Sequence, residues 1–299
     1  MNHILSAEQF TKKDIENIFD LANDMQQNPK KYSNSLNGKI IATLFYEPST
    51  RTRLSFESAI LRLGAANIST ENAKEMSSTI KGESLTDTIQ VIHGYADAIV
   101  MRHFEDDSGV RAAEVSNVPI INAGAGSGEH PTQALLDAFT IYQLKNGIDG
   151  VSVAILGDLL YGRTIHSLIK LLGLYQNITI YALSIPSLAL PKEYTDFMLK
   201  KGIKYVEAAS FLDLPQNLDI IYQTRTQTER FLKAGIPAAE FIINKDIMDK
   251  FSSQTFLMHP LPRNQEIANE LDQDPRSVYF NQSLNGMYVR MALLYTLLT

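Results

Sequence analysis

The sequence predicts an α/β protein with two doubly wound parallel-sheet domains that are joined by interdomain helices. Two observations support this prediction. Short apolar, β-branched runs alternate with helix-like segments along the whole chain, a pattern typical of parallel sheets with helices on both faces. The length of 299 residues is also more than one hydrophobic core usually holds, so two domains are expected.

The first half of the chain is expected to contain three strands. Residues Ile40 to Phe45 are apolar and rich in β-branched side chains, which predicts a buried strand. Apolar residues then recur from Phe56 to Leu63 at the spacing of one buried helix face, so a helix follows this strand. Two further strands are expected at Ala98–Met101 and Pro119–Asn122.

The second half repeats the alternation. A helix from about Pro131 to Leu144 is expected to connect the halves, and a final amphipathic helix covers Asn285–Leu298. The first domain is expected to span residues 1–130, completed by the terminal helix 285–299, and the second domain residues 131–284. Five strands are expected in the second half, at Val151–Leu156, Ile178–Leu183, Lys204–Glu207, Asp219–Gln223 and Phe256–Met258.

Composition restricts the function classes. With 44% hydrophobic and 20% charged residues the chain resembles ordinary soluble globular proteins, and a cytoplasmic location is expected because neither a membrane span nor a secretion signal is recognisable. The net charge of −6 argues against nonspecific nucleic-acid binding, which requires dense Lys and Arg contacts to phosphates. The absence of Cys excludes thiolate nucleophiles and Cys-ligated zinc in this chain.

The turn FYEPSTRTRLSFE, at Phe45–Glu57, joins the first strand to its helix. Ser49 or Thr50 can cap the first free backbone N–H groups of that helix. The remaining N–H groups and the helix dipole attract anions, and Arg51 and Thr52 add a charged fork and a hydroxyl. An ordinary capped helix with solvated arginines is the alternative, so other parts of the chain must decide.

Polar residues also follow the next two predicted strands. Arg102 and His103 end one strand, and the other continues into AGAGSGEHPTQ, whose glycines let the backbone approach a ligand closely. Pro131 at a first helical position puts His130 near a second helix N-terminus, although a lone histidine is more often structural. The G-x-G-x-G spacing does not match a dinucleotide-binding loop.

Cationic side chains after strands are the recurring feature of this net-acidic chain, and they are Arg51, Lys81, Arg102, Arg163 and Arg225. Together they can neutralise about four negative charges, enough for a phosphate-bearing reactant and a dicarboxylate. In HPLPR, two prolines around Leu261 predict a stiff loop with exposed carbonyls. No metalloprotease motif, carboxylate cluster or Walker loop is present. A site rich in donors and poor in nucleophiles indicates group transfer between two bound substrates.

The same segments carry a family resemblance. In order from Phe45 to Arg263, the motifs FYEPSTRTRLSFE, the loop with Ser77 and Lys81, MRH, HPTQ, GDLLYGRTIHSL, TRTQTER and HPLPR resemble those of the carbamoyltransferases. The last two resemble the aspartate branch of that family. Ornithine carbamoyltransferases typically carry an HCLP loop instead, and this chain has no Cys.

The resemblance implies transfer of the carbamoyl group of carbamoyl phosphate to the α-amine of L-aspartate, a step of pyrimidine biosynthesis. It implies that the amino-terminal domain binds carbamoyl phosphate and the second domain binds aspartate. It also implies a homotrimer with shared active sites, in which Ser77 and Lys81 reach in from the neighbouring subunit. Separate regulatory chains are possible, and no metal or organic cofactor is implied.

The resemblance further implies residue roles. The carbamoyl-phosphate site would comprise Ser49, Thr50, Arg51, Thr52, Ser77, Lys81, Arg102, His130, Gln133 and Leu261. The aspartate site would comprise Lys81, Arg163, Arg225, Gln227 and Leu261. The catalytic residues would be Arg51, Thr52, Lys81 and His130, with Arg51, Thr52 and His130 near the carbamoyl oxygen. Glu47 and Arg230 would join salt bridges that hold the domains closed.

Two positions depart from the family pattern, and two alternative functions stay open. Ile80 stands where some relatives carry a second lysine, and Leu160 where many relatives carry a lysine in GDLKYGRT. One alternative is a related carbamoyltransferase with another amine acceptor, since pocket chemistry decides the acceptor. The other is a catalytically silent anion-binding or scaffold protein.

Overall fold

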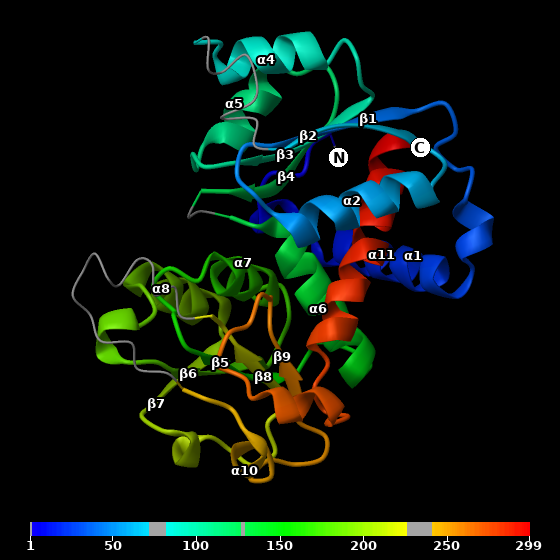
Figure 1. The fold of residues 1–299 in the computed structure, drawn as a ribbon. Coiled ribbons are helices and arrows are strands. Elements are labelled where there is room, and N and C mark those ends of the chain that lie inside the picture. Colours follow the sequence, from blue (N-terminus) through cyan, green and yellow to red (C-terminus); the bar gives the residue numbers. More distant parts are fainter. Residues whose placement is uncertain (1, 72–81, 127–128, 226–240) are drawn as a thin grey trace. The chain divides into compact units, whose positions relative to one another are not determined.

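The computed structural model describes residues 2–71, 82–126, 129–225 and 241–299. The chain forms two compact units, the first made of residues 1–136 and 285–299 and the second of residues 137–284 (Figure 1). Each unit is built around one parallel sheet with helices packed against it. The predicted α/β class with two parallel-sheet domains is therefore confirmed.

The first unit has a four-stranded sheet in the order β2-β1-β3-β4, and all neighbouring strands are parallel. Its strands are β1 (Ile40–Phe45), β2 (Ala66–Glu71), β3 (Ala98–His103) and β4 (Ile120–Ala125). Its helices are α1 (Lys12–Gln27), α2 (Thr50–Arg62), α4 (Leu85–Ile92) and α5 (Ser108–Val115). Two longer helices, α6 (Pro131–Lys145) and α11 (Tyr279–Leu298), contribute residues to both units.

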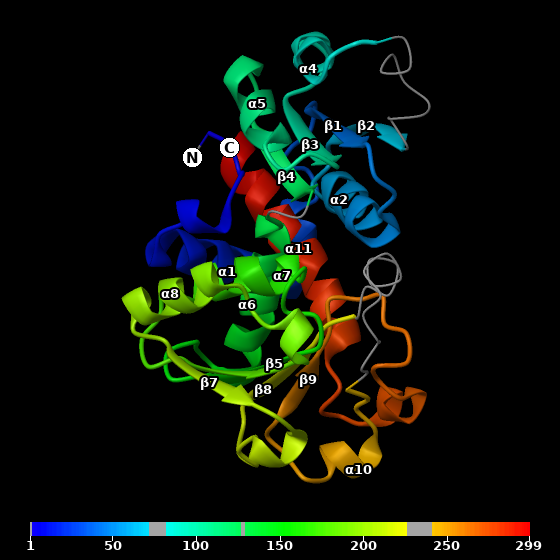
Figure 2. The same ribbon diagram turned by 90° about the vertical axis from the view of Figure 1, so that its left-hand side faces the viewer.

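Helices cover both faces of this sheet. Residues of α4 and α5, such as Ile89 and Ala112, pack against Ala42, Ile99 and Met101 from the strands. Figure 2 shows α2 and α11 on the opposite face. Strands β1, β3 and β4 are buried from both sides, which explains their nearly continuous apolar sequences.

The second unit has a five-stranded parallel sheet in the order β7-β6-β5-β8-β9. Its strands are β5 (Ser152–Leu156), β6 (Thr179–Leu183), β7 (Lys204–Ala208), β8 (Ile220–Gln223) and β9 (Phe256–Met258). Helices α7 (Arg163–Leu172) and α8 (Lys192–Lys201) lie together (Figure 1), and the short α10 (Lys245–Met248) belongs to another part of this unit. Met248 of α10 packs into a core with Leu156, Leu183 and Ile221.

The predicted element boundaries differ from the structure in several places, and β3 and β4 continue to His103 and Ala125, beyond their expected ends at Met101 and Asn122. Strand β2 (Ala66–Glu71) was not expected, because its sequence ANISTE is polar and no residue in it is fully buried. It lies at the edge of the sheet, where polar and charged side chains are usual. Helix α11 begins at Tyr279 instead of Asn285, since buried Tyr279 and Gln282 extend its packed face. Within the described ranges, no helix is both long enough and apolar enough to cross a membrane.

Candidate functional site

The first candidate edge lies where the strand order of the first sheet reverses. Strand β1 has β2 on one side and β3 on the other, and ligands of open α/β sheets bind beyond the carboxyl ends of strands at such a point. The ends of β1 and β3 are joined, because Tyr46 N donates to the carbonyl of Arg102 at 2.9 Å. The turn that begins at Tyr46 therefore starts beside Arg102.

Helix α2 begins in this turn with Ser49 at the N-cap position. The expected side-chain cap is absent, since the Ser49 hydroxyl makes no capping hydrogen bond to the described helix. Thr52 is buried, whereas Arg51 is exposed in the first turn. Arg53, on the same helix, has its guanidinium 3.0 Å from the Glu71 carboxylate. Hydroxyls, backbone N–H groups and Arg51 thus surround a helix N-terminus suited to an anion.

Arg102, Gly124 and His130 form the centre of this edge. The pairing of β3 with β4 shifts register between Met101 and His103, because Met101 pairs with Asn122 and His103 with Ala125, so Ala123 and Gly124 of β4 together lie opposite Arg102. Gly124 has φ +118°, and a Cβ there would lie 3.3 Å from Arg102 Nη1 and 3.4 Å from His130 Cδ2. The positive φ favours glycine at this position, and the guanidinium and the imidazole both lie close to the same point of backbone.

Neighbouring charges and burial define the surroundings of these groups. His130 is buried, and its carbonyl accepts the first hydrogen bonds of α6 from Gln133 N at 3.0 Å and Ala134 N at 3.1 Å. Glu47 Oε2 lies 3.5 Å from Arg102 Nε. Burial raises the pKa of Tyr46, so this phenol stays neutral and can donate a hydrogen bond. The site is therefore positively charged, partly shielded from water and rich in hydrogen-bond donors.

The N-terminal segment holds the loop that leads to His130. Ile4 N donates to the Ile120 carbonyl at 2.8 Å, and Ile4 forms a parallel bridge with Ile121. The Glu129 carboxylate accepts from Ala7 N at 2.7 Å and from Ser6 Oγ at 3.2 Å. Residues near the start of the chain thus fix the backbone immediately before His130.

The second candidate edge lies at the equivalent point of the second sheet. Strand β5 has β6 on one side and β8 on the other. Asp158 N donates to Thr224 Oγ1 at 3.1 Å, and Thr224 Oγ1 donates to the Leu156 carbonyl at 2.8 Å. A Cβ on Gly157 would lie 2.8 Å from Thr224 O, so only glycine allows the two strand ends this close.

Two arginines extend from these joined strand ends. Arg163 is the first residue of α7, where the N–H groups and the dipole also favour an anion. Arg225 directly follows Thr224, and both arginines are partly buried. Asp158 Oδ1 accepts from Tyr161 N at 2.9 Å, which shapes the turn before Arg163. This edge can therefore present two guanidinium groups to a dianionic ligand.

The HPLPR loop lies after β9 in the same unit. Leu261 has φ +53°, and its N–H donates to His259 Nδ1 at 2.8 Å. His259 Nε2 lies 3.0 Å from Glu266 Oε1, and both side chains are buried. Although burial opposes ionisation, the hydrogen bond from His259 holds the pKa of Glu266 below its usual value. A charged carboxylate therefore supports this loop.

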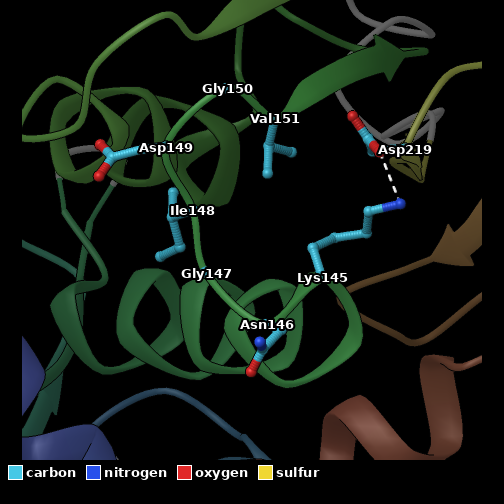
Figure 3. Close-up of a pocket in the computed structure, with 8 residues that line it drawn as sticks. All are labelled: Lys145, Asn146, Gly147, Ile148, Asp149, Gly150, Val151 and Asp219. Atoms are coloured by element: carbon cyan, nitrogen blue, oxygen red, sulfur yellow. Dashed lines mark ion pairs between the residues drawn. The ribbon is translucent and has the colours of Figure 1, made fainter.

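A pocket of about 330 Å³ lies at the other end of the second sheet (Figure 3). Lys145 Nζ pairs there with Asp219 Oδ1 at 2.6 Å, and the residues from Lys145 to Val151 precede β5. Ligands of parallel sheets bind at the opposite, carboxyl edge, so this pocket is not the candidate site. Among the described residues, no group of three His, Asp or Glu side chains is arranged to hold a metal.

Two family models match successive parts of the chain. The family model "Aspartate/ornithine carbamoyltransferase, carbamoyl-P binding domain" matches residues 2–143, and "Aspartate/ornithine carbamoyltransferase, Asp/Orn binding domain" matches residues 149–297. The chain belongs to the aspartate/ornithine carbamoyltransferase family. The predicted resemblance is thereby confirmed.

Members of the aspartate branch of this family align along the whole chain. The aspartate carbamoyltransferase catalytic subunit of Methanocaldococcus jannaschii is 45% identical over 303 residues, covering 100% of this chain and 98% of the relative, and its crystal structure superposes with a TM-score of 0.92. The chloroplastic aspartate carbamoyltransferase of Arabidopsis thaliana is 44% identical, covering 100% and 78%. Aspartate transcarbamoylase of Trypanosoma cruzi, solved with N-(phosphonacetyl)-L-aspartic acid, is 38% identical with a TM-score of 0.93 and coverage of 100% and 96%.

The structure distributes the predicted site residues over both edges. In the first unit it brings Ser49, Thr50, Arg51, Thr52, Arg102, His130 and Gln133 to one edge, and in the second it places Arg163, Arg225 and Leu261 after strands. Ser77, Lys81 and Gln227 lie outside the described residues, as does Ile80. Leu160 lies in the turn between β5 and α7.

Several supporting residues were not predicted. They are Asn122, Glu129, Asp158, Thr224, His259 and Glu266, and each makes a hydrogen bond at one of the two edges or in the HPLPR loop. Glu129 and Thr224 directly precede the predicted residues His130 and Arg225, which was the signal available in the sequence. Their partners Ala7 and Asp158 are far away in the chain, so the sequence did not indicate these two contacts.

Proposed function

We propose that this chain transfers the carbamoyl group of carbamoyl phosphate to the α-amine of L-aspartate, giving N-carbamoyl-L-aspartate and phosphate. The approach of Arg102 and His130 to Gly124, beside the turn of Ser49 to Thr52, carries this proposal. It is supported by the relative from Trypanosoma cruzi, which was solved with carbamoyl phosphate and aspartate. The reaction is a step of pyrimidine biosynthesis.

The first unit would bind carbamoyl phosphate. Backbone N–H groups at the start of α2, the hydroxyls of Ser49, Thr50 and Thr52, and the guanidinium groups of Arg51 and Arg102 would bind the phosphate. Thr52 and His130 would donate to the carbamoyl oxygen, and Gln133 would accept from the carbamoyl NH₂ group. Ser77 and Lys81 would add a hydroxyl and a cation.

The second unit would bind aspartate. Arg163 and Arg225 would each pair with one carboxylate, with Gln227 and Lys81 assisting. The carbonyl of Leu261 can only accept hydrogen bonds, so its suitable partners are the aspartate amine and the carbamoyl NH₂ group. In this assignment, residues 1–130 with 285–299 bind carbamoyl phosphate and residues 131–284 bind aspartate.

The chemistry needs no covalent enzyme intermediate. The neutral amine nitrogen of aspartate attacks the carbonyl carbon and forms the new C–N bond, and the electron pair on oxygen is stabilised by Arg51, Thr52 and His130. The electron pair on the oxyanion then re-forms the C=O bond, the bond from carbon to the bridging oxygen breaks, and phosphate leaves with the electron pair of that broken bond. A phosphate oxygen accepts the proton lost by the amine. Holding both reactants in attack geometry contributes much of the acceleration.

The assembly is part of the proposal. We infer a cytoplasmic homotrimer in which Ser77 and Lys81 complete the site of a neighbouring subunit. Separate regulatory chains could bind to this trimer. Mixing subunits that carry Lys81→Ala with subunits that carry Arg51→Ala should then restore activity, because some sites in the hybrid trimers receive neither substitution. Recovery in reassembled trimers supports sharing, and no recovery contradicts it.

The reaction is tested by phosphate release from carbamoyl phosphate in the presence of L-aspartate, L-ornithine or no acceptor. The proposal expects release that depends on aspartate alone, with N-carbamoyl-L-aspartate identified by mass spectrometry. Stimulation by another amine would overturn the acceptor assignment. No release with any acceptor would leave an anion-binding protein without this activity, and phosphate-dependent thermal stabilisation would then support that alternative.

A further inference from the structure

The backbone of Leu261 is held in an unusual conformation. Its φ of +53° lies in the left-handed region, which a residue with a branched side chain rarely adopts unless its surroundings impose it. The residues on both sides are Pro260 and Pro262, which carry no backbone N–H. Leu261 therefore supplies the only backbone donor of these three residues, and whatever accepts from it helps to fix the carbonyl of the same residue.

The acceptor is the ring of His259. Leu261 N donates to His259 Nδ1 at 2.8 Å, so Nδ1 carries no hydrogen. The ring hydrogen then lies on Nε2, which donates to Glu266 Oε1 at 3.0 Å. Glu266 Oε2 also accepts from Asn264 N at 3.0 Å. The imidazole thus links the middle of the loop to its end, and the carboxylate selects the tautomer that can accept from Leu261.

Buried groups also anchor the beginning of the loop. His259 N donates to Gln282 Oε1 at 2.9 Å, and Gln282 Nε2 donates to Asp137 Oδ1 at 2.6 Å. Asp137 Oδ2 accepts from Tyr222 OH at 2.7 Å. Gln282, Asp137 and Tyr222 are almost completely buried, so these hydrogen bonds do not compete with water. The loop is therefore connected to α11, α6 and β8.

We propose that His259 is a positioning residue for the carbamoyl transfer: with its tautomer selected by Glu266, it orients the Leu261 carbonyl toward the amine or carbamoyl NH₂ group. This inference rests on the proposed function, which assigns Leu261 to reactant binding. A displacement of about 1 Å in a reactant-positioning group can cost roughly 100-fold in rate. The hydrogen bond from Leu261 N to His259 is thus expected to affect turnover as well as stability.

The test compares His259→Ala with His259→Asn in the full chain. The amide oxygen of Asn lies two bonds from Cβ, as Nδ1 does in His, and Asn side chains commonly accept from the N–H two residues further on. His259→Asn therefore keeps the acceptor for Leu261 N and loses the contact with Glu266. We expect His259→Ala to lower kcat/KM for aspartate by roughly 100-fold and His259→Asn to recover at least about tenfold of that loss.

A matched control separates positioning from general destabilisation. Thr255 is fully buried in the same unit, and its hydroxyl donates to the Leu218 carbonyl at 2.6 Å. Thr255→Val removes this buried hydrogen bond, so it should lower the Tm without changing kcat/KM for aspartate. Hydrogen exchange of the Leu261 amide gives a readout independent of turnover. Protection should persist in the unaltered chain and in His259→Asn and be lost in His259→Ala.

The outcomes separate this inference from the proposed reaction. Aspartate-dependent turnover by the unaltered chain tests the reaction, and the difference between the Asn and Ala variants tests the positioning role. If the unaltered chain turns over and both variants lose activity equally, the positioning role is overturned while the reaction stands. Unchanged protection of the Leu261 amide in His259→Ala would overturn the role of His259 whether or not turnover occurs.

Discussion

The two sheets are stabilised by the same kind of aspartate contact at their amino edges. In the first unit, Asp97 precedes β3, accepts from Ile40 N at 2.8 Å and pairs with Lys39. In the second, Asp219 precedes β8, accepts from Ser152 N at 2.9 Å and pairs with Lys145. In both units, an aspartate before one strand thus accepts a hydrogen bond from the first residue of the neighbouring central strand.

The carboxyl edges of the two sheets differ. In the first, a bulge and Gly124 bring Arg102 and buried His130 to one point beside a helix N-terminus. In the second, Thr224 joins two strand ends, and arginines leave from each of them. Similar sheets can thus share the contacts that stabilise them, while the residues at the ends of their strands differ, as expected if the two edges bind different reactants.

The largest effect is expected within one turn of the first edge. Arg51→Ala should lower kcat by roughly 100- to 1,000-fold, because it removes a donor to the oxyanion and to phosphate. The matched control is Arg53→Ala. In the unaltered chain the Arg53 guanidinium pairs with Glu71, and removing this pair should change the free energy of unfolding by no more than about 1 kcal/mol. Initial rates and thermal melts of both variants check this. Similar loss of turnover in both would contradict the distinction between these arginines.

A smaller and different effect is expected at the second edge. Arg225→Ala should raise KM for aspartate by about 10- to 100-fold, the value of a hydrogen bond to a charged group, with KM for carbamoyl phosphate nearly unchanged. Initial rates with each substrate varied in turn provide the measurement. An equal rise in both constants would show that the second edge does not serve aspartate alone.

The N-terminal support of the first edge should matter less. Glu129→Ala removes the acceptor of Ala7 N and Ser6 Oγ and loosens the backbone before His130, so we expect a several-fold decrease in kcat with little change in KM for aspartate. Glu8→Ala, an exposed change in the same segment, is the control. Unchanged kcat in Glu129→Ala would exclude this contact from the positioning of His130.

The smallest effects are expected at the amino edges. Burial opposes ionisation of Asp219, but Lys145 and Ser152 lower its pKa, and the N–H of Ile40, together with Lys39, lowers the pKa of Asp97. A lowered pKa gives stability that is present above the unfolded-state pKa, about 3.9, and is lost as pH falls. The Tm difference between the unaltered chain and Asp219→Asn should therefore shrink from about pH 5 downward.

Asp97→Asn provides the comparison between the two amino edges. The Asp97 side chain is 37% exposed and that of Asp219 is 23% exposed, so solvent screens the contacts of Asp97 more. The Tm difference should accordingly be smaller for Asp97→Asn at pH 7. A larger Tm difference for Asp97→Asn, or one that grows as pH falls, would contradict this account of the aspartate contacts.

Most of the fold followed from apolar patterns. Eight of the nine strands in the described ranges were expected, most of them because buried parallel strands are apolar throughout. Strand β2 was missed because ANISTE is polar, and only its pairing with β1 makes it a strand. Helix α11 starts earlier than expected, because the polar residues Asn281 and Gln282 obscured the helical pattern, although Tyr279 and Gln282 are buried in this part of the helix.

The candidate site was predictable where chemistry lies within short motifs. Charged residues at or after the carboxyl ends of strands, such as Arg102 and Arg163, could be recognised because parallel strands share a carboxyl edge. The contacts of Glu129 with Ser6 and of Gln282 with His259 join residues far apart in sequence. Spacing along the chain contains no information about such pairs. Ser49 or Thr50 was expected to cap α2, but the Ser49 hydroxyl makes no capping hydrogen bond, because such a bond requires a turn geometry that residue type does not determine.

The central claim is that the two carboxyl edges bind different reactants. Calorimetric titration of carbamoyl phosphate into Arg102→Ala and Arg225→Ala, in the absence of aspartate, tests it most directly. We expect Arg225→Ala to bind carbamoyl phosphate as tightly as the unaltered chain and Arg102→Ala to bind it at least about tenfold more weakly. Equal weakening in both variants, or full affinity in Arg102→Ala, would contradict the assignment.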